Sequence, residues 1–248
     1  MDKNTIVIID YGSQYTQLIA RRVRELNVFS IIVPYDFDES YLDVNNIKGI
    51  ILSGGPSSVY EKSAPFLPAN IFDYNVPILG ICYGFQLLIE KFSGIVNSST
   101  KAEYGKSYIN ISTKVKLFED LSTESKVWMS HGDKVSKLPE NWTVTSKSEN
   151  DIISSAENFD KKYYGVQFHP EVIHTNDGHK IINNFLFKIC AVNDDWNSKN
   201  FAINTIKNIR ELVGNKKVLC ALSGGVDSTV VATLLSEAIG DNVTCVFI

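Results

Sequence analysis

A cysteine flanked by two glycines is the first feature of this sequence that suits chemistry. Gly80-Ile81-Cys82-Tyr83-Gly84 has the pattern glycine–any–nucleophile–any–glycine, and it stands between a predicted buried strand and a predicted amphipathic helix. A sharp turn there holds the sulfur at the start of the helix, where the helix dipole favours the reactive thiolate. The pattern indicates a nucleophile, although a lone cysteine is more often a small core residue.

A histidine and a glutamate two residues apart supply the base that such a cysteine needs. Gln167-Phe168-His169-Pro170-Glu171 follows a predicted strand, and residues two apart on an extended segment point to the same side. Glu171 can therefore orient the imidazole of His169, which in turn takes the thiol proton of Cys82. Together the two motifs favour nucleophilic catalysis far more than either does alone. We interpret His174 and His179 as surface residues.

Two segments are placed to stabilise the oxyanion that forms when a thiolate attacks a carbonyl. The backbone N–H of Tyr83 follows the nucleophile directly. Ser53-Gly54-Gly55-Pro56 ends a neighbouring predicted strand, and consecutive glycines let a backbone turn its amides outward. One of these two glycines is a candidate for the second donor, although such a turn after a strand is common.

The elements that position these residues predict an α/β fold with an open, mostly parallel sheet flanked by helices. Short apolar runs alternate with amphipathic stretches in the first half of the chain, which is typical of βα units. The predicted strands there are Thr5–Ile9, Val28–Val33, Gly49–Leu52 and Pro77–Ile81, and the first helix is Gln14–Leu26. From about Tyr104 to Gln167 we expect short β-rich pieces, and a helix from about Asp177 to Cys190 closes the block.

The chain divides into a domain at residues 1–190, a polar linker at 191–200 and a shorter segment at 201–248. The last segment predicts a helix (Phe201–Val213), a strand (Lys217–Leu222), a second helix and a strand at Val243–Ile248. A single βαβ unit cannot cover both faces of a parallel sheet, and the sequence is apolar to its last residue. We therefore expect the natural protein to continue beyond Ile248, or these residues to dock on a partner.

Composition excludes several classes of protein. Lys+Arg 24 against Asp+Glu 28 gives a net charge of −4, which argues against a nucleic-acid protein that relies on a basic face. No apolar run approaches the ~20 residues of a membrane span, and a strand predicted from Thr5 leaves no room for a signal peptide. The four cysteines lie too far apart for a metal site or a disulfide framework. We expect a reduced, cytoplasmic protein with no metal in this part.

From about Thr5 to Cys190 the sequence resembles the class I, triad-type glutamine amidotransferases, on the strength of the cysteine turn, the His-x-Glu pair and the double glycine. The resemblance implies that Cys82 attacks the glutamine amide, that His169 is base and acid, and that Glu171 orients it. It implies oxyanion amides from Gly55 and Tyr83. It also implies a glutamine pocket lined by Gly54, Gln86, Ser130, His131 and Gly132.

Three segments resemble the GMP synthetase branch of that family: 10–17, 128–133 and 169–175. After the linker, Leu222-Ser223-Gly224-Gly225-Val226-Asp227-Ser228-Thr229 is an S-G-G-x-D-S loop between a strand and a helix, which suits an anion. It lacks the lysine of a Walker A loop and resembles the pyrophosphate loop of the ATP pyrophosphatases. Phe85 and Thr229 stand where we expect Met and Ser in the family.

The second resemblance implies that the loop binds ATP with Mg²⁺ and that ATP activates xanthosine monophosphate as an adenylyl ester, which ammonia then converts to GMP. The ATP-binding residues would be Ser223, Gly224, Gly225, Val226, Asp227, Ser228 and Thr229, with a site that is incomplete in this chain. The implied partners are glutamine, ATP and xanthosine monophosphate, and the full-length protein is expected to be a homodimer.

Three other interpretations stay open. The chain is alternatively a glutaminase that serves another synthetase acceptor, which ATP–pyrophosphate exchange driven by xanthosine monophosphate would decide. A non-catalytic scaffold is disfavoured because all three triad residue types are present. A cysteine hydrolase that acts on peptides or γ-glutamyl compounds would cleave peptides instead of releasing ammonia from glutamine.

Overall fold

Nine strands of the first folded unit form one sheet. The computed structural model describes residues 4–38, 47–112 and 115–248, so Met1–Lys3 of the expected N-terminal stretch lie outside the described residues. Contacts divide the chain into two units, Met1–Asp195 and Trp196–Ile248. The order of strands in the sheet is β2-β1-β3-β4-β9-β8-β7-β5-β6. Their bounds are β1 Thr5–Asp10, β2 Phe29–Pro34, β3 Ile47–Leu52, β4 Ile78–Ile81, β5 Ile95–Ile111, β6 Glu124–Lys137, β7 Thr143–Ser148, β8 Ile153–Asn158 and β9 Tyr163–Val166.

The sheet is parallel in one half and antiparallel in the other. Strands β2, β1, β3, β4 and β9 pair in parallel, whereas the pairs from β9 through β8, β7 and β5 to β6 are antiparallel. The predicted α/β class with an open, helix-flanked sheet is confirmed. The parallel arrangement holds for the half built from βα units, and the sheet as a whole is mixed.

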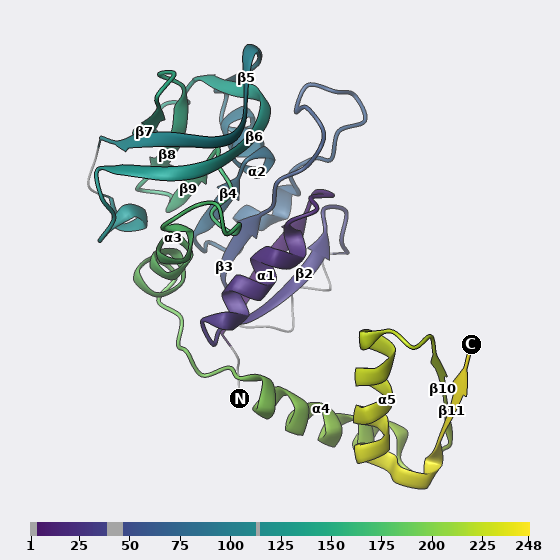
Figure 1. The fold of residues 1–248 in the computed structure, drawn as a ribbon. Coiled ribbons are helices and arrows are strands. Elements are labelled where there is room, and N and C mark those ends of the chain that lie inside the picture. The colour runs from purple at the N-terminus through teal and green to yellow at the C-terminus, as the bar shows by residue number, and fades with distance from the viewer. Residues whose placement is uncertain (1–3, 39–46, 113–114) are drawn as a thin grey trace. The chain divides into compact units, whose positions relative to one another are not determined.

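Helices cover both faces of the parallel half. The helices are α1 Thr16–Glu25, α2 Tyr83–Lys91 and α3 Gly178–Asn183, which continues as a π-helix over Asn184–Ile189. Side chains of β1 alternate between two buried clusters: Ile6 and Ile8 pack with residues of α1 and α3, and Val7 and Ile9 pack with residues of α2. Figure 1 shows α1 beside β2 and the long β5–β6 ribbon farther along the sheet. The site therefore rests on a sheet that is buried on both faces.

The longest strands are the ones that the sequence pattern describes least well. We expect only short β-rich pieces from about Tyr104 to Gln167, whereas β5 has 17 residues and β6 has 14. Residues 97–107 of β5 are mostly polar, so they show no apolar alternation. The antiparallel ladder with β6, which runs from Ile95 against Lys137 to Asn110 against Glu124, holds them extended.

The second unit is a helix followed by a βαβ motif. Its elements are α4 Ser198–Val213, β10 Val218–Leu222, α5 Val226–Ile239 and β11 Val243–Phe247 (Figure 1). Strands β10 and β11 pair in parallel, as the predicted βαβ requires. The Asn197 side chain accepts from the Asn200 N–H at 2.8 Å. This cap starts α4 at Ser198, so the end of the expected linker is helical.

No helix among the described residues combines the length and the apolar character needed to cross a membrane. All four cysteines are free thiols: Cys82, Cys190 and Cys220 are buried and Cys245 is exposed. Among residues 4–38, 47–112 and 115–248, no cluster of His, Cys, Asp and Glu suits a metal ion.

Candidate active site

Four neighbouring strands bring the predicted reactive segments to one edge of the sheet. Strands β1, β3, β4 and β9 are adjacent in that order and parallel, so their carboxyl ends meet. They lead into the Tyr11–Tyr15 loop, the Ser53–Gly55 loop, Cys82 and the Gln167–Glu171 segment, respectively. Open α/β sheets bind their ligands at this edge. Topology thus assembles residues that are far apart in sequence.

The turn at Cys82 is strained and closely packed. Cys82 has φ 52° and ψ −103°, in a region that non-glycine residues rarely adopt and that persists only when the surroundings hold it. A Cβ on Gly80 would lie 2.6 Å from the Phe85 nitrogen, and one on Gly84 would lie 2.5 Å from Leu52 Cβ. Both neighbours are therefore restricted to glycine. The turn presents the sulfur at the N-terminus of α2.

The structure brings Cys82, His169 and Glu171 together. His169 Nδ1 lies 2.8 Å from Glu171 Oε1, and all three side chains are buried. Burial is the largest influence on the pKa of His169 and lowers it. The charge of Glu171 and hydrogen bonds with Cys82 and Glu171 outweigh it, so the pKa is well above the usual histidine value. The raised pKa favours the protonated imidazole, which is the form that can donate a proton to a departing group.

Neighbouring groups hold this histidine and glutamate in place. The Thr175 hydroxyl donates to the His169 carbonyl at 2.6 Å, and Arg22 Nε donates to the Glu171 carbonyl at 3.0 Å. The Tyr15 ring meets the His169 ring edge to face at 5.1 Å. These contacts from three different segments hold the His169 imidazole in one orientation. Its Nδ1 faces Glu171, and the other edge of the ring faces Cys82.

The double-glycine loop lies directly against these residues. A Cβ on Gly54 would approach His169 Cε1 to 3.1 Å and Cys82 Cβ to 3.7 Å, and one on Gly55 would lie 2.9 Å from the Tyr11 carbonyl. Among the described residues, neither the Gly55 N–H nor the Tyr83 N–H has a protein acceptor. Two free amides beside a nucleophile form the arrangement expected of an oxyanion hole.

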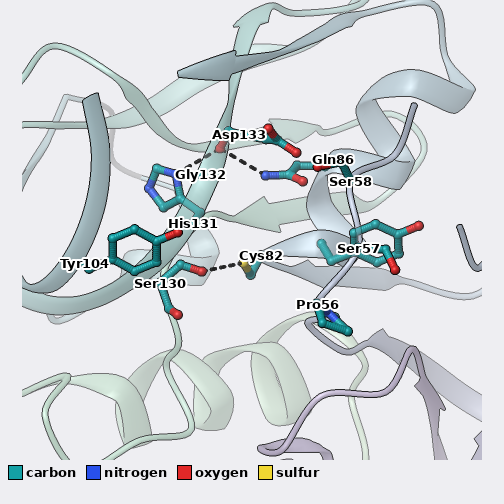
Figure 2. A pocket seen from close by; sticks show the side chains of 12 residues that line it. Pro56, Ser57, Ser58, Cys82, Gln86, Tyr104, Ser130, His131, Gly132 and Asp133 are labelled. Carbon is teal, nitrogen blue, oxygen red and sulfur yellow. Dashed lines mark hydrogen bonds between the residues drawn. The ribbon is translucent and has the colours of Figure 1, made fainter. Parts of the chain in front are cut away.

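A cavity of about 330 Å³ opens beside Cys82 (Figure 2). It is lined by four of the five residues predicted for the pocket, namely Gln86, Ser130, His131 and Gly132, together with Gly55, Pro56, Ser57, Ser58, Cys82, Tyr83, Tyr104 and Asp133. Gly54 lies between Cys82 and His169 and does not line this cavity. The Gln86 amide donates to the Asp133 carbonyl at 3.2 Å, which fixes the side chain at the wall.

The glycine loop of the second unit is open at a helix N-terminus. Gly224 has φ +79°, which favours glycine, and Gly225 is the N-cap of α5. The Ser223 and Ser228 hydroxyls lie 3.2 Å apart, and the Thr229 hydroxyl donates to the Gly225 carbonyl at 2.9 Å. The loop is exposed, so its free amides and hydroxyls remain accessible to an anion.

Comparison of the sequence with models of known protein families identifies the family of this chain. The model of class I glutamine amidotransferases matches residues 7–189, well over half of the chain. The chain belongs to the class I glutamine amidotransferase family. A second model, described as the tRNA methyl transferase HUP domain, matches residues 216–248. Residues 216–248, which lie in the second unit, are therefore similar to part of a HUP domain.

Individual relatives agree with this assignment. The chain is 50% identical over 248 residues to GMP synthase [glutamine-hydrolyzing] of Clostridium tetani, which covers all of this chain and 49% of that protein. It is 49% identical over 245 residues to the Bacillus cereus GMP synthase, covering 99% of this chain and 48% of that one. The chain spans about half the length of these curated relatives. Among solved structures, the chain is similar to a Thermoplasma acidophilum protein that is provisionally named as one chain of a GMP synthase. The two sequences are 32% identical, and the structures superpose with a TM-score of 0.66. The match covers 77% of this chain and 96% of that one.

Three residues of this amidotransferase site were not indicated as candidates by the sequence motifs. Asp133 lines the cavity with its carboxylate buried, and the Tyr60 hydroxyl donates to its Oδ1 at 2.6 Å. Glu103, on β5, is buried and lies 3.1 Å from Nε2 of His131. Asp133 follows Ser130-His131-Gly132 directly, so its position next to that stretch was the signal that could have found it. No motif in the neighbouring sequence marks Glu103 or Tyr60 as a site residue, because their partners, His131 and Asp133, lie far away in the sequence.

Proposed function

We propose that this chain hydrolyses glutamine at Cys82 and forms the glutaminase portion of a GMP synthase. The observation that carries the first half is the buried Glu171–His169 pair aimed at a strained cysteine beside two free amides. The second half rests on the order of the parts, since an amidotransferase unit is followed by a glycine loop at a helix N-terminus.

The geometry supports a two-step acyl transfer. The Cys82 thiolate attacks the amide carbon of glutamine, and the amides of Gly55 and Tyr83 hold the oxyanion. The C–N bond breaks as the His169 imidazolium protonates the departing nitrogen, leaving a glutamyl thioester and free ammonia. Water then adds to the thioester carbonyl as His169 takes its proton, the C–S bond breaks, and glutamate leaves the restored thiolate–imidazolium pair.

The cavity in Figure 2 suits the amino-acid end of glutamine. Asp133 is the acidic group of its lining, and a carboxylate pairs with the α-ammonium group of an amino acid. The Tyr60 hydroxyl now donates to that carboxylate, so a bound ammonium group would take a position next to it or replace it. Gln86 and the Ser130–Gly132 segment would contact the rest of the substrate.

The loop Ser223–Thr229 fits a polyphosphate such as that of ATP. Its exposed amides and the hydroxyls of Ser223 and Ser228 would hold phosphate oxygens, in a turn that needs the positive φ of Gly224, and Asp227 is the candidate contact for Mg²⁺. ATP would supply the adenylyl group that activates the C2 oxygen of xanthosine monophosphate. We also propose that the full-length protein is cytoplasmic and forms a homodimer. Sedimentation of the full-length chain tests the oligomeric state.

A labelling experiment tests the glutaminase proposal. The chain is incubated with glutamine, or with 6-diazo-5-oxo-norleucine, an electrophile that mimics glutamine, and ammonia release and the modified residue are measured. We expect Cys82→Ala to abolish both ammonia release and labelling. Cys245→Ala, a change at an exposed cysteine of the second unit, is the control and should retain both. Labelling at another cysteine would contradict the proposal.

A second experiment addresses the acceptor. Exchange of labelled pyrophosphate into ATP is measured in the full-length protein with and without xanthosine monophosphate. Exchange that requires xanthosine monophosphate supports GMP synthesis. Exchange driven by a different acceptor, with glutaminase activity intact, would favour the alternative that this glutaminase serves another synthetase.

A further inference from the structure

Two separate cavities meet at the nucleophile. The first is the cavity described above, which contains Gln86 and Asp133. The second, also about 330 Å³, includes Cys82 as well and is lined by the Gly12–Tyr15 loop and His169. The two share only Gly55, Pro56, Cys82 and Ser130. A molecule in one cavity therefore meets the sulfur from a different side than a molecule in the other.

The polar groups are divided between the cavities in a way that matches the two halves of the reaction. The Asp133 carboxylate and the Gln86 amide, which suit the substrate's amino-acid end, line the first cavity and not the second, where Gln14 supplies the amide group. The base lines the second cavity alone, since His169 belongs to that lining and not to the first. Glu171 holds Nδ1 of His169 at 2.8 Å, so the ring edge that exchanges protons is the other one.

Once the thioester has formed, its glutamyl chain fills the first cavity and closes that approach to the carbonyl carbon. The nitrogen that received a proton from His169 is then on the His169 side, and the water that gives a proton to His169 must reach the same side. We propose that the second cavity is the chamber through which ammonia leaves and in which the hydrolytic water is held, an inference that rests on the proposed glutaminase function.

Ser13 is the group in this chamber that is best placed to hold the water. Its hydroxyl oxygen accepts from the Tyr15 N–H at 3.1 Å, which fixes the oxygen, and its own proton has no acceptor among the described residues. It also lies beside Gly54, because a Cβ on Gly54 would be 3.5 Å from Ser13 Oγ and 3.1 Å from His169 Cε1. A donor held this close to the base can orient one water molecule. Ser13 is thus a positioning residue for the second step.

Hydrolysis of the thioester balances in atoms and charge with water as its only added reactant. Water forms a bond from its oxygen to the thioester carbon and gives one proton to His169, and the C–S bond breaks to return the thiolate. The γ-carboxyl group that is released then loses its remaining proton to ammonia, so that glutamine and water yield glutamate and ammonium.

The test compares two serine-to-leucine variants of the 248-residue chain, one in each cavity. Ser13→Leu fills the second cavity and Ser58→Leu fills the first; both serines are half-buried. Two rates are measured: labelling of Cys82 by 6-diazo-5-oxo-norleucine, and hydrolysis of the glutamyl thioester, with the thioester quantified by mass spectrometry after an acid quench. Hydroxylamine is added as a second nucleophile, and formation of the γ-glutamyl hydroxamate is followed.

For Ser13→Leu we expect thioester hydrolysis and hydroxamate formation to fall about tenfold or more, with labelling within about twofold of wild type, so the thioester accumulates. Ser58→Leu should slow labelling and accumulate no thioester. Ser13→Ala should slow hydrolysis several-fold and Ser13→Thr should restore it, which separates the lost hydroxyl from a folding defect.

Two outcomes overturn the inference. One is hydrolysis at the wild-type rate in a Ser13→Leu chain that still labels at Cys82. The other is a loss of labelling in Ser13→Leu as large as its loss of hydrolysis, together with a Ser13→Ala chain that hydrolyses the thioester like wild type. A wild-type chain that neither labels nor forms a thioester instead contradicts the proposed glutaminase function itself.

Discussion

Glu103 Oε2 lies 3.1 Å from Nε2 of His131, both side chains are buried, and His131 lines the cavity beside Cys82. The other nitrogen of His131 lies 2.8 Å from the Asp133 carbonyl, and Glu103 Oε1 accepts from Ser148 and Asn150 at 2.8 Å each. Burial, the largest influence, raises the pKa of Glu103, but these hydrogen bonds outweigh it and the pKa is below the usual value. A charged carboxylate thus fixes the strand that carries Ser130–Asp133.

Removing that carboxylate should weaken both folding and substrate binding. Glu103→Ala leaves the buried Nε2 of His131 without its hydrogen-bond partner, and an unsatisfied buried polar group costs about 1–3 kcal/mol of unfolding free energy. The KM for glutamine should rise, whereas the rate of Cys82 labelling at saturating electrophile stays close to wild type. Urea unfolding and steady-state kinetics measure the two effects. Glu103→Gln should lose less of both, and equal losses in the two variants would contradict this role.

Replacing Glu171 should change the pH dependence of the site. The charge of Glu171 raises the pKa of His169, so this pair stabilises the fold fully below the usual histidine pKa of about 6.5 and loses its effect as the pH rises through the raised value. Glu171→Gln should therefore destabilise most near pH 6 and less at higher pH. Thioester formation should fall about 100-fold or more. Unfolding at several pH values checks the first effect, with the exposed Glu140→Gln as control.

The close packing at Gly84 predicts a severe defect from one methyl group. Its Cβ would lie 2.5 Å from Leu52 Cβ, so Gly84→Ala must shift the turn that holds Cys82. Overpacking of this kind costs about 1–3 kcal/mol, and a displaced nucleophile loses about 100-fold in rate. Gly132→Ala is the matched control for stability, because its Cβ would meet only Tyr104 Oη at 3.6 Å. Thermal unfolding and ammonia release measure both; similar losses of stability in the two variants would contradict the packing argument.

Asp133 and Tyr60 should act on substrate binding in opposite directions. Asp133→Asn removes the carboxylate that we propose pairs with the α-ammonium group of glutamine. A charge-assisted hydrogen bond contributes about 1.5–3 kcal/mol, so the KM should rise about 10-fold or more at a similar kcat. Tyr60→Phe removes the hydroxyl that now occupies Asp133 Oδ1 at 2.6 Å, so the KM should fall. Glutamine titrations distinguish these; an unchanged KM for Asp133→Asn would exclude its pairing with substrate.

The glycine loop of the second unit can be tested independently of the first. Gly224 has φ +79°, and alanine costs about 1–2 kcal/mol in the left-handed region. In the full-length protein, Gly224→Ala should reduce ATP–pyrophosphate exchange strongly. Labelling of Cys82 by the electrophile should stay at the wild-type rate, because the loop belongs to the other unit. Exchange at the wild-type rate would show that the loop does not hold the phosphates.

The features that could be predicted from sequence are those set by neighbours in the chain. Gly80, Cys82 and Gly84 mark a sharp turn because only glycine fits on either side, and the two-residue spacing of His169 and Glu171 already placed both side chains together. The apolar runs of β1, β3 and β4 identified the parallel half of the sheet. The roles of Cys82, His169 and Glu171 in catalysis stay predictions until the variants are measured.

Features that depend on distant partners could not be predicted in the same way. The first part of β5 is polar and is held by its ladder with β6, so Glu103 was not assigned to a strand. The Tyr60–Asp133 bond joins a loop after β3 to β6, and the second cavity exists only because the Gly12–Tyr15 loop faces His169. Such contacts are fixed by sheet order, which a pattern of residues does not specify.

The order of strands in the sheet also affects when the site can form during synthesis of the protein. Strand β9 enters the sheet between β4 and β8, where Ile78 pairs with Tyr163, and the segment after β9 carries His169. During translation the nucleophile therefore emerges long before its base, and the base reaches it only when a late strand inserts beside an early one. A nascent chain that ends before β9 contains Cys82 but not His169, so the proposed glutaminase reaction requires that β9 has been synthesised and has paired with β4.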